Sequence, residues 1–547
     1  MKDIGITRRT SLPLRRLLAL LAVPLLIASA CATKSSPKSE GNAGPPKAGG
    51  TLTIGLDAET DGWNPTASQW AAPSYYVAEA IFDPLVTFGA DNKTHPYLAE
   101  SITPNADFTQ WTIKLRPGIT FQDGEPLNAD ALKLQLDKDK ASFLVGQLLH
   151  PLQSTDKVDD LTVRVNMSEP WVAFPAAMAS QAGFMAAPKQ LNATGADATD
   201  HPIGTGPYVF KEWARDDHLT ATKNPNYWRK GTPYPDQVVF RVIPDDQSRL
   251  ASLQSKQIDL MYTGAASVIM QARGDKSLRM KEADTDPTTM IMLNNAVAPT
   301  DDLRVRQALS LATDTKQLIS TVGQGLAKQA DGPYLPDSPW YAPSGYPLSP
   351  DLNKARSLLD AYKQDHNISG DLKFTVGCTP TPTNTQSMEL LKTQWAKVGV
   401  DITLKYTEQA TYINDAVTGN FQANCWAQLG ATDPDLDALW WLSANAAPVG
   451  SIAVNFMRLK DPQIDTALET GRHTDDVAQR KAAYAEVWKR LAADVPYVWL
   501  THGHIAVISS GRVHGVGTGK LPDGAAPLLY KGEVPQVVPL LTLWVDQ

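Results

Sequence analysis

The stretch that decides the fold runs from Tyr75 to Leu132 and includes AEAIFDPLVTF at 78–88, PYLAES at 96–101 and WTIKLRPGITFQDGEPLNADAL at 111–132. In the last block Trp111, Ile113 and Leu115 alternate with polar residues, the period-two pattern of a half-buried strand. Pro117-Gly118 then predicts a turn, and Asn128 predicts the start of a helix because its side chain can cap the first backbone N–H groups. The residues of this stretch therefore build the fold and do not indicate a ligand or a reaction.

Further blocks follow in a fixed order: GTGPY at 204–208, NPNYW at 224–228, LRVRQAL at 303–309, GNF at 419–421 and DVP at 494–496. Together with the opening stretch they resemble the peptide- and nickel-class solute receptors of ABC importers, the extracellular solute-binding proteins of family 5. The resemblance covers nearly everything after Gly49.

The resemblance implies an α/β protein with a two-lobed, hinged, periplasmic-binding-protein-like fold and an extra subdomain on the first lobe. Chain order then gives the expected limits. Lobe I comprises 51–88, 200–292 and 494–547, the inserted subdomain spans 89–199, and lobe II spans 293–493.

Residues 1–30 read as a signal peptide. Four arginines precede an apolar run at 17–30, which is too short to cross a bilayer core of about 30 Å. Ala28-Ser29-Ala30 directly before Cys31 resembles the lipobox of bacterial lipoproteins, so we expect Cys31 to be lipidated. The alternative is a plain secretory signal with an incidental cysteine. Arg8-Arg9 leaves twin-arginine export open beside the general route.

Residues 31–50 are expected to form a flexible tether, because beyond Cys31 alanine is their only apolar residue type and they cannot bury enough surface to fold. The receptor would then sit outside the cytoplasm, held on the outer face of the cell membrane by its lipid. Residues 1–30 carry five basic and one acidic side chain, so their removal takes the net charge from −8 to about −12. This charge argues against nucleic acid and anionic lipid surfaces.

Two cysteines remain once Cys31 carries lipid. Cys378 follows a predicted strand at 372–376, and Cys425 lies in another at 421–426. An even pair in an oxidising compartment favours a disulfide, provided that the two strands are neighbours in the sheet. Two buried thiols are the alternative.

Ligands of open α/β sheets bind beyond the carboxyl ends of strands, which directs attention to the residues after Trp426. In the peptide-binding members of the family an aspartate a few residues after this tryptophan pairs with the amino terminus of the peptide. Here Gln428, Leu429 and Gly430 occupy that stretch, and Asp433, which could substitute, matches an Asp-Pro turn instead. A buried ammonium without a carboxylate costs several kcal/mol. Longer, blocked or neutral ligands are therefore favoured over a free amino terminus.

Aromatic residues are the other candidates for ligand contact. Trp426 and Trp440 would line the cleft from lobe II, while Trp63, Trp70 and Tyr75, which follow the first predicted strand, would line it from lobe I. Each is equally compatible with ordinary core packing. The 14 tryptophans leave oligosaccharides open beside peptides, and metal chelates and haem-like ligands are not separated either.

The sequence contains no Gly-x-Ser-x-Gly, no His-Glu-x-x-His and no phosphate loop with lysine, so no enzyme activity is expected. His502-Gly503-His504 is the one close histidine pair, and a metal site would need more ligands. We expect no metal and no cofactor. The expected function is a monomeric, membrane-anchored receptor that captures an extracellular peptide or peptide-like ligand and delivers it to the permease subunits of an ABC importer. The alternatives are an oligosaccharide or other small-molecule receptor, a signalling or envelope-assembly lipoprotein, or a hydrolase.

Overall fold

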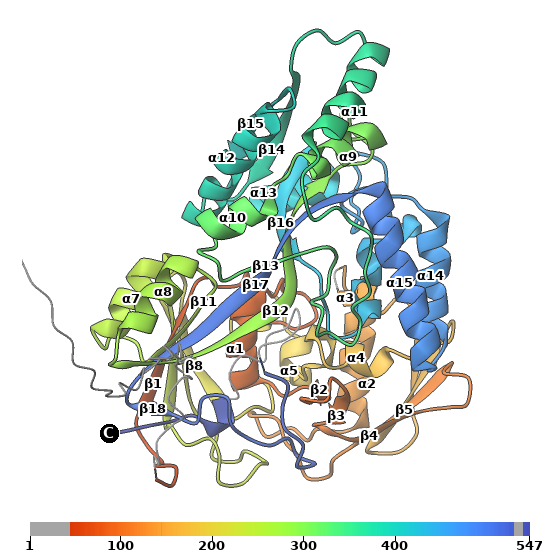
Figure 1. Ribbon diagram of the computed structural model, residues 1–547. Coiled ribbons are helices and arrows are strands. Elements are labelled where there is room, and N and C mark those ends of the chain that lie inside the picture. The colour runs from red at the N-terminus through yellow and green to blue at the C-terminus, as the bar shows by residue number, and fades with distance from the viewer. Residues whose placement is uncertain (1–43, 144, 530–539) are drawn as a thin grey trace, which may run out of the picture. The chain divides into compact units, whose positions relative to one another are not determined.

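The computed structural model describes residues 44–143, 145–529 and 540–547 (Figure 1). The expected signal peptide, Cys31 and the first part of the tether lie outside these ranges. Within them, no helix combines the length and apolar character needed to cross a membrane.

One 11-stranded sheet organises the fold, in the order β15-β14-β16-β12-β17-β11-β1-β10-β9-β8, with β13 paired to β17. Its strands are β1 Thr51–Leu56, β8 Tyr208–Ala214, β9 His218–Lys223, β10 Gln237–Val242, β11 Leu260–Thr263, β12 Leu278–Leu293, β13 Lys328–Gln329, β14 Leu372–Cys378, β15 Val400–Tyr406, β16 Ala423–Gln428 and β17 Tyr497–Ser510.

The long strands β12 and β17 join the two halves of this sheet. They pair antiparallel along most of their length (Figure 1), with a register shift between Asp284 and Thr288. Alongside residues 278–284 of β12, the other edge of β17 pairs with β11. Alongside residues 288–293, the other edge of β12 pairs with β16, beginning with Thr288 opposite Gln428. The region from 284 to 288, opposite 502–504, is therefore where the sheet passes from one half to the other, and we call it the crossover.

Parallel strands on both sides end at the crossover. In one half β1 is parallel to β10 and β11, and β11 ends at Thr263 opposite Ala506, two residues from His504. In the other half β14 is parallel to β15 and β16, and β16 ends at Gln428 opposite Thr288. Because ligands of open α/β sheets bind beyond the carboxyl ends of strands, the crossover is the place to look for a site.

Helices cover both faces of each half. On β12, Ile291 and Leu293 face one core while Met290 and Met292 face another, which explains the unbroken apolar run at 290–293. The first of these cores is closed by α9 Leu303–Leu311, α11 Leu352–Asp365 and α12 Pro382–Ala396, and the second by α14 Pro462–His473, α15 Val477–Asp494 and the 3-10 helix η2 Pro434–Trp440. In the other half the cores are closed by α1 Ala72–Ile81 and by α7 Asp246–Gln254 with α8 Ala266–Gly274.

The segment 89–199 contains a separate four-stranded antiparallel sheet, β4 Ala99–Pro104, β5 Gln110–Leu115, β7 Thr162–Met167 and β6 Leu152–Lys157, packed on α2 Ala129–Ala141. The strand predicted from Trp111, Ile113 and Leu115 is confirmed, and all three side chains are buried. Asn128 caps α2 as predicted, since its side chain accepts from the N–H of Ala131 at 3.0 Å.

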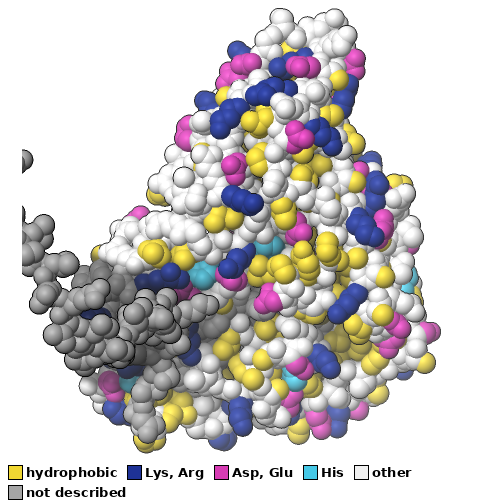
Figure 2. Space-filling view, viewed as in Figure 1, with side chains coloured by type: hydrophobic (Ala, Val, Ile, Leu, Met, Phe, Trp, Pro, Cys, Tyr) yellow, Lys and Arg dark blue, Asp and Glu magenta, His cyan; other side chains and the backbone are white. Residues whose placement is uncertain are grey.

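Short elements complete the described chain: β2 Val86–Phe88, β3 Thr94–Pro96, α3 Val145–Leu148, α4 Phe174–Ala177, η1 Gln181–Gly183, α5 Pro188–Leu191, α6 Ala196–Thr199, α10 Thr315–Thr321, α13 Gln409–Thr418, η3 Ser443–Asn445, β18 Val513–His514, η4 Leu540–Thr542 and β19 Trp544–Val545. On the face shown in Figure 2, acidic and basic side chains are interspersed rather than gathered by sign.

The two strands predicted around Cys378 and Cys425 are parallel neighbours, with Gly377 opposite Asn424. Cys378 and Cys425, which follow Gly377 and Asn424, form a disulfide with their Cα atoms 5.2 Å apart. The bond ties the last residue of β14 to the middle of β16.

We predict that the mature protein, unfolded without reductant, exposes no reactive thiol to Ellman's reagent. Replacing both cysteines, as Cys378→Ser with Cys425→Ser, should lower the free energy of unfolding by about 2–4 kcal/mol, because the bond closes a 47-residue separation in the unfolded chain. Urea unfolding of both proteins measures the difference. Two titrating thiols, or equal stability of the double variant, would contradict the prediction.

Candidate functional site

The chain leaves β16 through a sharp turn at the crossover. Leu429 and Gly430 both adopt left-handed backbone conformations, with φ of 73° and 88°. A Cβ on residue 430 would lie 2.8 Å from backbone and side-chain atoms of Asp286 and from the carbonyl oxygen of Pro333, so only glycine fits. The backbone of Gln428 still pairs with Thr288, and the turn begins directly after it.

Asp433, the acid considered as a partner for a ligand amine, is paired inside the protein. Both of its oxygens accept from the guanidinium of Arg480 on α15, at 2.7 and 3.0 Å. The same carboxylate accepts from the N–H of Asp435 and caps η2. Its role in this structure is to fasten the turn to α15.

Asp435 and Asp437, the next two acids, also have partners inside the protein. Asp435 accepts from Arg472 Nε at 3.0 Å and from Trp171 Nε1 at 2.6 Å. Asp437 accepts from the N–H groups of Gly430 and Ala431 at 2.9 and 3.0 Å. Asp433, Asp435 and Asp437 are 9%, 3% and 0% exposed, so this loop presents none of its three carboxylates to a ligand.

Arg472 also connects α14 to the segment 89–199. Its Nη1 donates to Glu169 at 3.2 Å and lies 2.7 Å from His150 Nε2, and His473 contacts Glu169 at 3.1 Å. Hydrogen bonds from His150 and His473 and the charge of Arg472 lower the pKa of Glu169 to about 2. The loop after β16 is thus tied to α14, to α15 and to the inserted segment at once.

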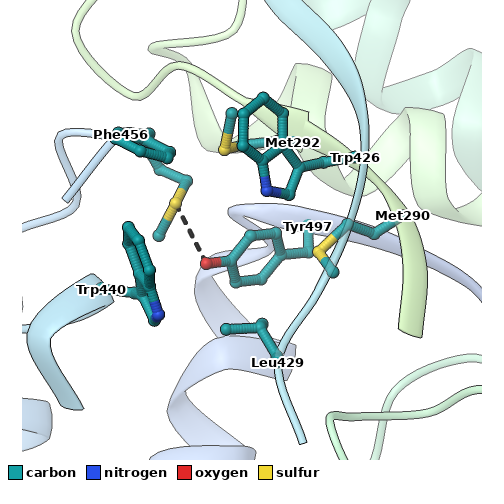
Figure 3. Close-up of a pocket in the computed structure, with 8 residues that line it drawn as sticks. Met290, Met292, Trp426, Leu429, Trp440, Phe456 and Tyr497 are labelled. Carbon is teal, nitrogen blue, oxygen red and sulfur yellow. Dashed lines mark hydrogen bonds between the residues drawn. The ribbon is translucent and has the colours of Figure 1, made fainter. Parts of the chain in front are cut away.

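An apolar pocket lies beside this loop (Figure 3). We call it the methionine–tryptophan pocket; it is narrow, and its free space is about that of one water molecule. Its lining residues are Met290, Met292, Trp426, Leu429, Trp440, Phe456, Met457 and Tyr497. The structure therefore brings together three of the residues selected from the sequence, Trp426, Leu429 and Trp440.

Aromatic contacts fix the walls of the pocket. The ring of Trp426 stacks on Tyr412 with centroids 5.3 Å apart, and Phe456 meets Trp426 edge-on at 5.4 Å. Trp440 lies 5.1 Å from Phe456. The hydroxyl of Tyr497 donates to Met457 Sδ at 3.0 Å, the contact drawn in Figure 3.

The comparisons with known proteins agree with this geometry. The model of the bacterial extracellular solute-binding proteins, family 5 Middle, matches residues 93–448, which is more than half of the chain. The chain belongs to the bacterial extracellular solute-binding proteins of family 5. Proteins of this family are extracytoplasmic, bind small ligands and work with the permeases of ABC importers. They are not enzymes, and neither is this family 5 protein.

Its relatives include the glutathione-binding protein GsiB of Pectobacterium atrosepticum, 28% identical over 454 residues, which covers 81% of this chain and 87% of that protein. GsiB of Escherichia coli O157:H7 is 33% identical over 301 residues, 54% of this chain and 57% of that protein.

Among solved structures, DppA of Helicobacter pylori in complex with the peptide STSA matches 92% of the chain and 99% of that protein, with a TM-score of 0.79 and 22% identity. AppA of Bacillus subtilis in complex with a nonapeptide matches 92% of the chain and all of that protein, with a TM-score of 0.79 and 21% identity. At these identities the likeness shows the fold: α/β, with two lobes.

The candidates from lobe I of this family 5 protein pack into its core. Trp63 is buried, with its ring 5.4 Å from that of Trp213. Trp70 donates from Nε1 to the carbonyl of Gly62 and lies 5.9 Å from the ring of Tyr75. None of the three candidates lines the methionine–tryptophan pocket.

Sequence reasoning missed five of the lining residues, Met290, Met292, Phe456, Met457 and Tyr497. The apolar run at 290–293 was the available signal, because it identifies a strand buried on both faces. It does not identify which face borders a pocket.

His502 is buried at the crossover, with 1% of its surface exposed. Its Nδ1–H donates to the carbonyl of Asp286 at 2.8 Å, while Nε2 has no partner among the described residues. Burial lowers its pKa from 6.5 to about 4, so the ring is neutral at pH 7. The described residues hold no group of three or more His, Cys, Asp or Glu side chains placed to bind a metal ion.

We predict that Gly430→Ala lowers stability more than Gly450→Ala does. Both glycines have left-handed backbones, with φ of 88° and 90°, which costs an L-residue about 1–2 kcal/mol. Only at Gly430 would the new Cβ also meet neighbouring atoms, since nothing lies within 4 Å at Gly450. Comparing the free energies of unfolding of the two variants in urea separates the cost of the Cβ contacts from the cost of the left-handed backbone. Equal losses would show that the packing at Gly430 is unimportant.

We predict that His502 makes the protein less stable in acid. The folded pKa of about 4 lies below the unfolded value of 6.5, so its stabilising effect is complete above pH 6.5 and is lost as the pH falls towards 4. The full effect is about 3 kcal/mol. In His502→Gln the free energy of unfolding should fall less steeply between pH 6.5 and 4 than in the parent protein. Parallel profiles would exclude the effect.

Proposed function

We propose that the protein is a membrane-held receptor that captures an extracellular peptide or peptide-like ligand between its lobes and releases it unchanged to the permease subunits of an ABC importer. The observation that carries this proposal is the meeting of strand carboxyl ends from both halves of the sheet at the crossover, with an apolar pocket beside them. A ligand held there would touch both lobes and favour the closed arrangement over the open one.

The comparisons support a peptide-like ligand through what other proteins bind. The relatives named above are glutathione-binding proteins, and two of the similar structures hold peptides. The loop after β16 adds a restriction, because its three carboxylates are already paired or hydrogen-bonded. A blocked, longer or neutral ligand fits this loop better than a free amino terminus. An oligosaccharide receptor is the second candidate, favoured by the tryptophans at the pocket.

We propose that Trp426, Leu429 and Trp440 contact the ligand, and that Gln428 and Gly430 shape the same edge. Trp63, Trp70 and Tyr75, the contacts expected from lobe I, pack in or against the core of the other half and are not included in this set. A lipid on Cys31, the tether at 31–50, a monomeric state and the lobe limits given above belong to the same proposal.

Native mass spectrometry of protein purified without denaturation tests the receptor class. We expect an intact compound to be released on unfolding. Release of hydrolysed products alone would favour a hydrolase. If a deletion strain still takes up the recovered compound normally, a signalling or envelope-assembly role would replace uptake.

We predict that Trp426→Ala weakens binding of the recovered compound by more than about 1 kcal/mol, because the ring forms a wall of the pocket. Isothermal titration calorimetry measures the affinity, and Trp426→Phe should restore part of it. Trp213→Ala removes another half-buried tryptophan outside the pocket and serves as the matched control. If both alanine variants weaken binding equally, the loss is general and Trp426 is not a contact.

A further inference from the structure

We propose that the methionine–tryptophan pocket selects the ligand: it receives one uncharged, flexible apolar group, such as a thioether or an unbranched aliphatic side chain, and excludes charged groups. The inference rests on the proposed function, because it assigns a substrate class to the same site. Four features of the structure carry it.

The walls offer no countercharge to a charged group. No lining residue is charged, and the lining hydroxyl, that of Tyr497, already donates to Met457 Sδ and accepts from Trp441 Nε1 at 3.2 Å. A charge transferred from water into such surroundings would lose its hydration without gaining an ion-pair partner. That transfer is strongly unfavourable.

The surrounding charges are not available as partners either. Asp433 and Arg480 satisfy each other in a two-pronged ion pair, and Asp435 is paired with Arg472. Recruiting one of these groups to a ligand would leave its present partner as a buried unpaired charge, which is strongly unfavourable. The ion pairs thus keep the pocket apolar.

The lining is adaptable on one side. Met290, Met292 and Met457 contribute three unbranched, polarisable side chains to the pocket. Ile291 and Leu293, which alternate with the first two along β12, face the opposite core. The flexible side chains therefore lie on the pocket face of the strand. They can rearrange around an entering group in a space that is small when empty.

Two tryptophans are the lining residues most exposed to solvent, and we infer that the pocket opens between them. Trp426 and Trp440 are half-buried, whereas the other six lining residues are buried. Leu429 places the same pocket directly after the carboxyl end of β16. A ligand main chain lying along the crossover could insert a side chain between the two indole rings.

The test uses the methionines as reporters. The chain has 11, so a protein labelled with 13C in the methionine methyl groups gives a short spectrum that single Met→Leu variants can assign. The probes are N-acetyl-L-methioninamide, its sulfoxide and N-acetyl-L-lysinamide, together with acetylated, amidated tetrapeptides that carry one methionine among glycines. The sulfoxide is the matched control, because oxidation makes the same side chain polar.

We expect N-acetyl-L-methioninamide to shift the methyl signals of Met290, Met292 and Met457, while the sulfoxide and the lysine amide leave them in place. A tetrapeptide with methionine at the preferred position should bind at least tenfold more tightly than its sulfoxide. Trp440→Ala should abolish this preference, while Met292→Leu, which conserves volume, should retain it. Thermal melting of each variant shows whether it is folded.

The outcomes separate the two proposals. If the tetrapeptides bind but the three methyl signals stay fixed, or the lysine probe binds as well as the methionine probe, the pocket assignment is wrong and the receptor function stands. If only N-acetyl-L-methioninamide moves the signals, the pocket is supported and a peptide ligand is not. Absence of any response to probes or peptides would overturn the pocket and the peptide class together.

Discussion

The antiparallel pairing of β12 with β17 is the constraint on which the rest of the structure depends. These two strands carry the sheet from one half to the other, and the neighbouring strands β11 and β16 attach to them on opposite sides of the crossover. Space is tight there, because a Cβ on Gly503 would lie 2.6 Å from the side-chain oxygen of Thr285. Every strand that ends at the crossover is positioned through this pair.

The loop after β16 shows how the crossover is connected to the helices. Its three acids bind to α15, to α14 with the inserted segment, and to the loop's own backbone. Buried ion pairs of this kind often add little net stability, because desolvation offsets their attraction. Their consequence is positional: they hold Leu429 at the rim of the pocket. They also use up the charges that a ligand would otherwise meet.

Local patterns predicted the local structure well. The alternation at 111–115, the cap at Asn128 and the two strands that contain Cys378 and Cys425 all follow from residues close together in sequence. That the last two strands are neighbours was only a condition for the disulfide, and the sheet meets it. The loop at 428–430 also stood out, because it lacks the acid that the resemblance leads one to expect. The pocket itself could not be predicted from local sequence patterns. It needs Met290, Trp426 and Tyr497 in one place, and long-range strand pairing brings them there: Met290 lies opposite Trp426, 136 residues later in the chain, and Met292 lies opposite Tyr497, 205 residues later.

The aromatic residues show why a site is harder to predict than a fold. Trp63 and Trp426 both follow or end a strand and look alike in sequence, yet the first packs against Trp213 in a core and the second lines a pocket. The difference comes from neighbours contributed by remote segments. Around Trp426 those neighbours are a fixed frame of ion pairs on one side and movable methionine side chains on the other. Because the frame excludes charge and the methionines adapt to shape, such a site discriminates by polarity more strongly than by the exact form of the group it accepts.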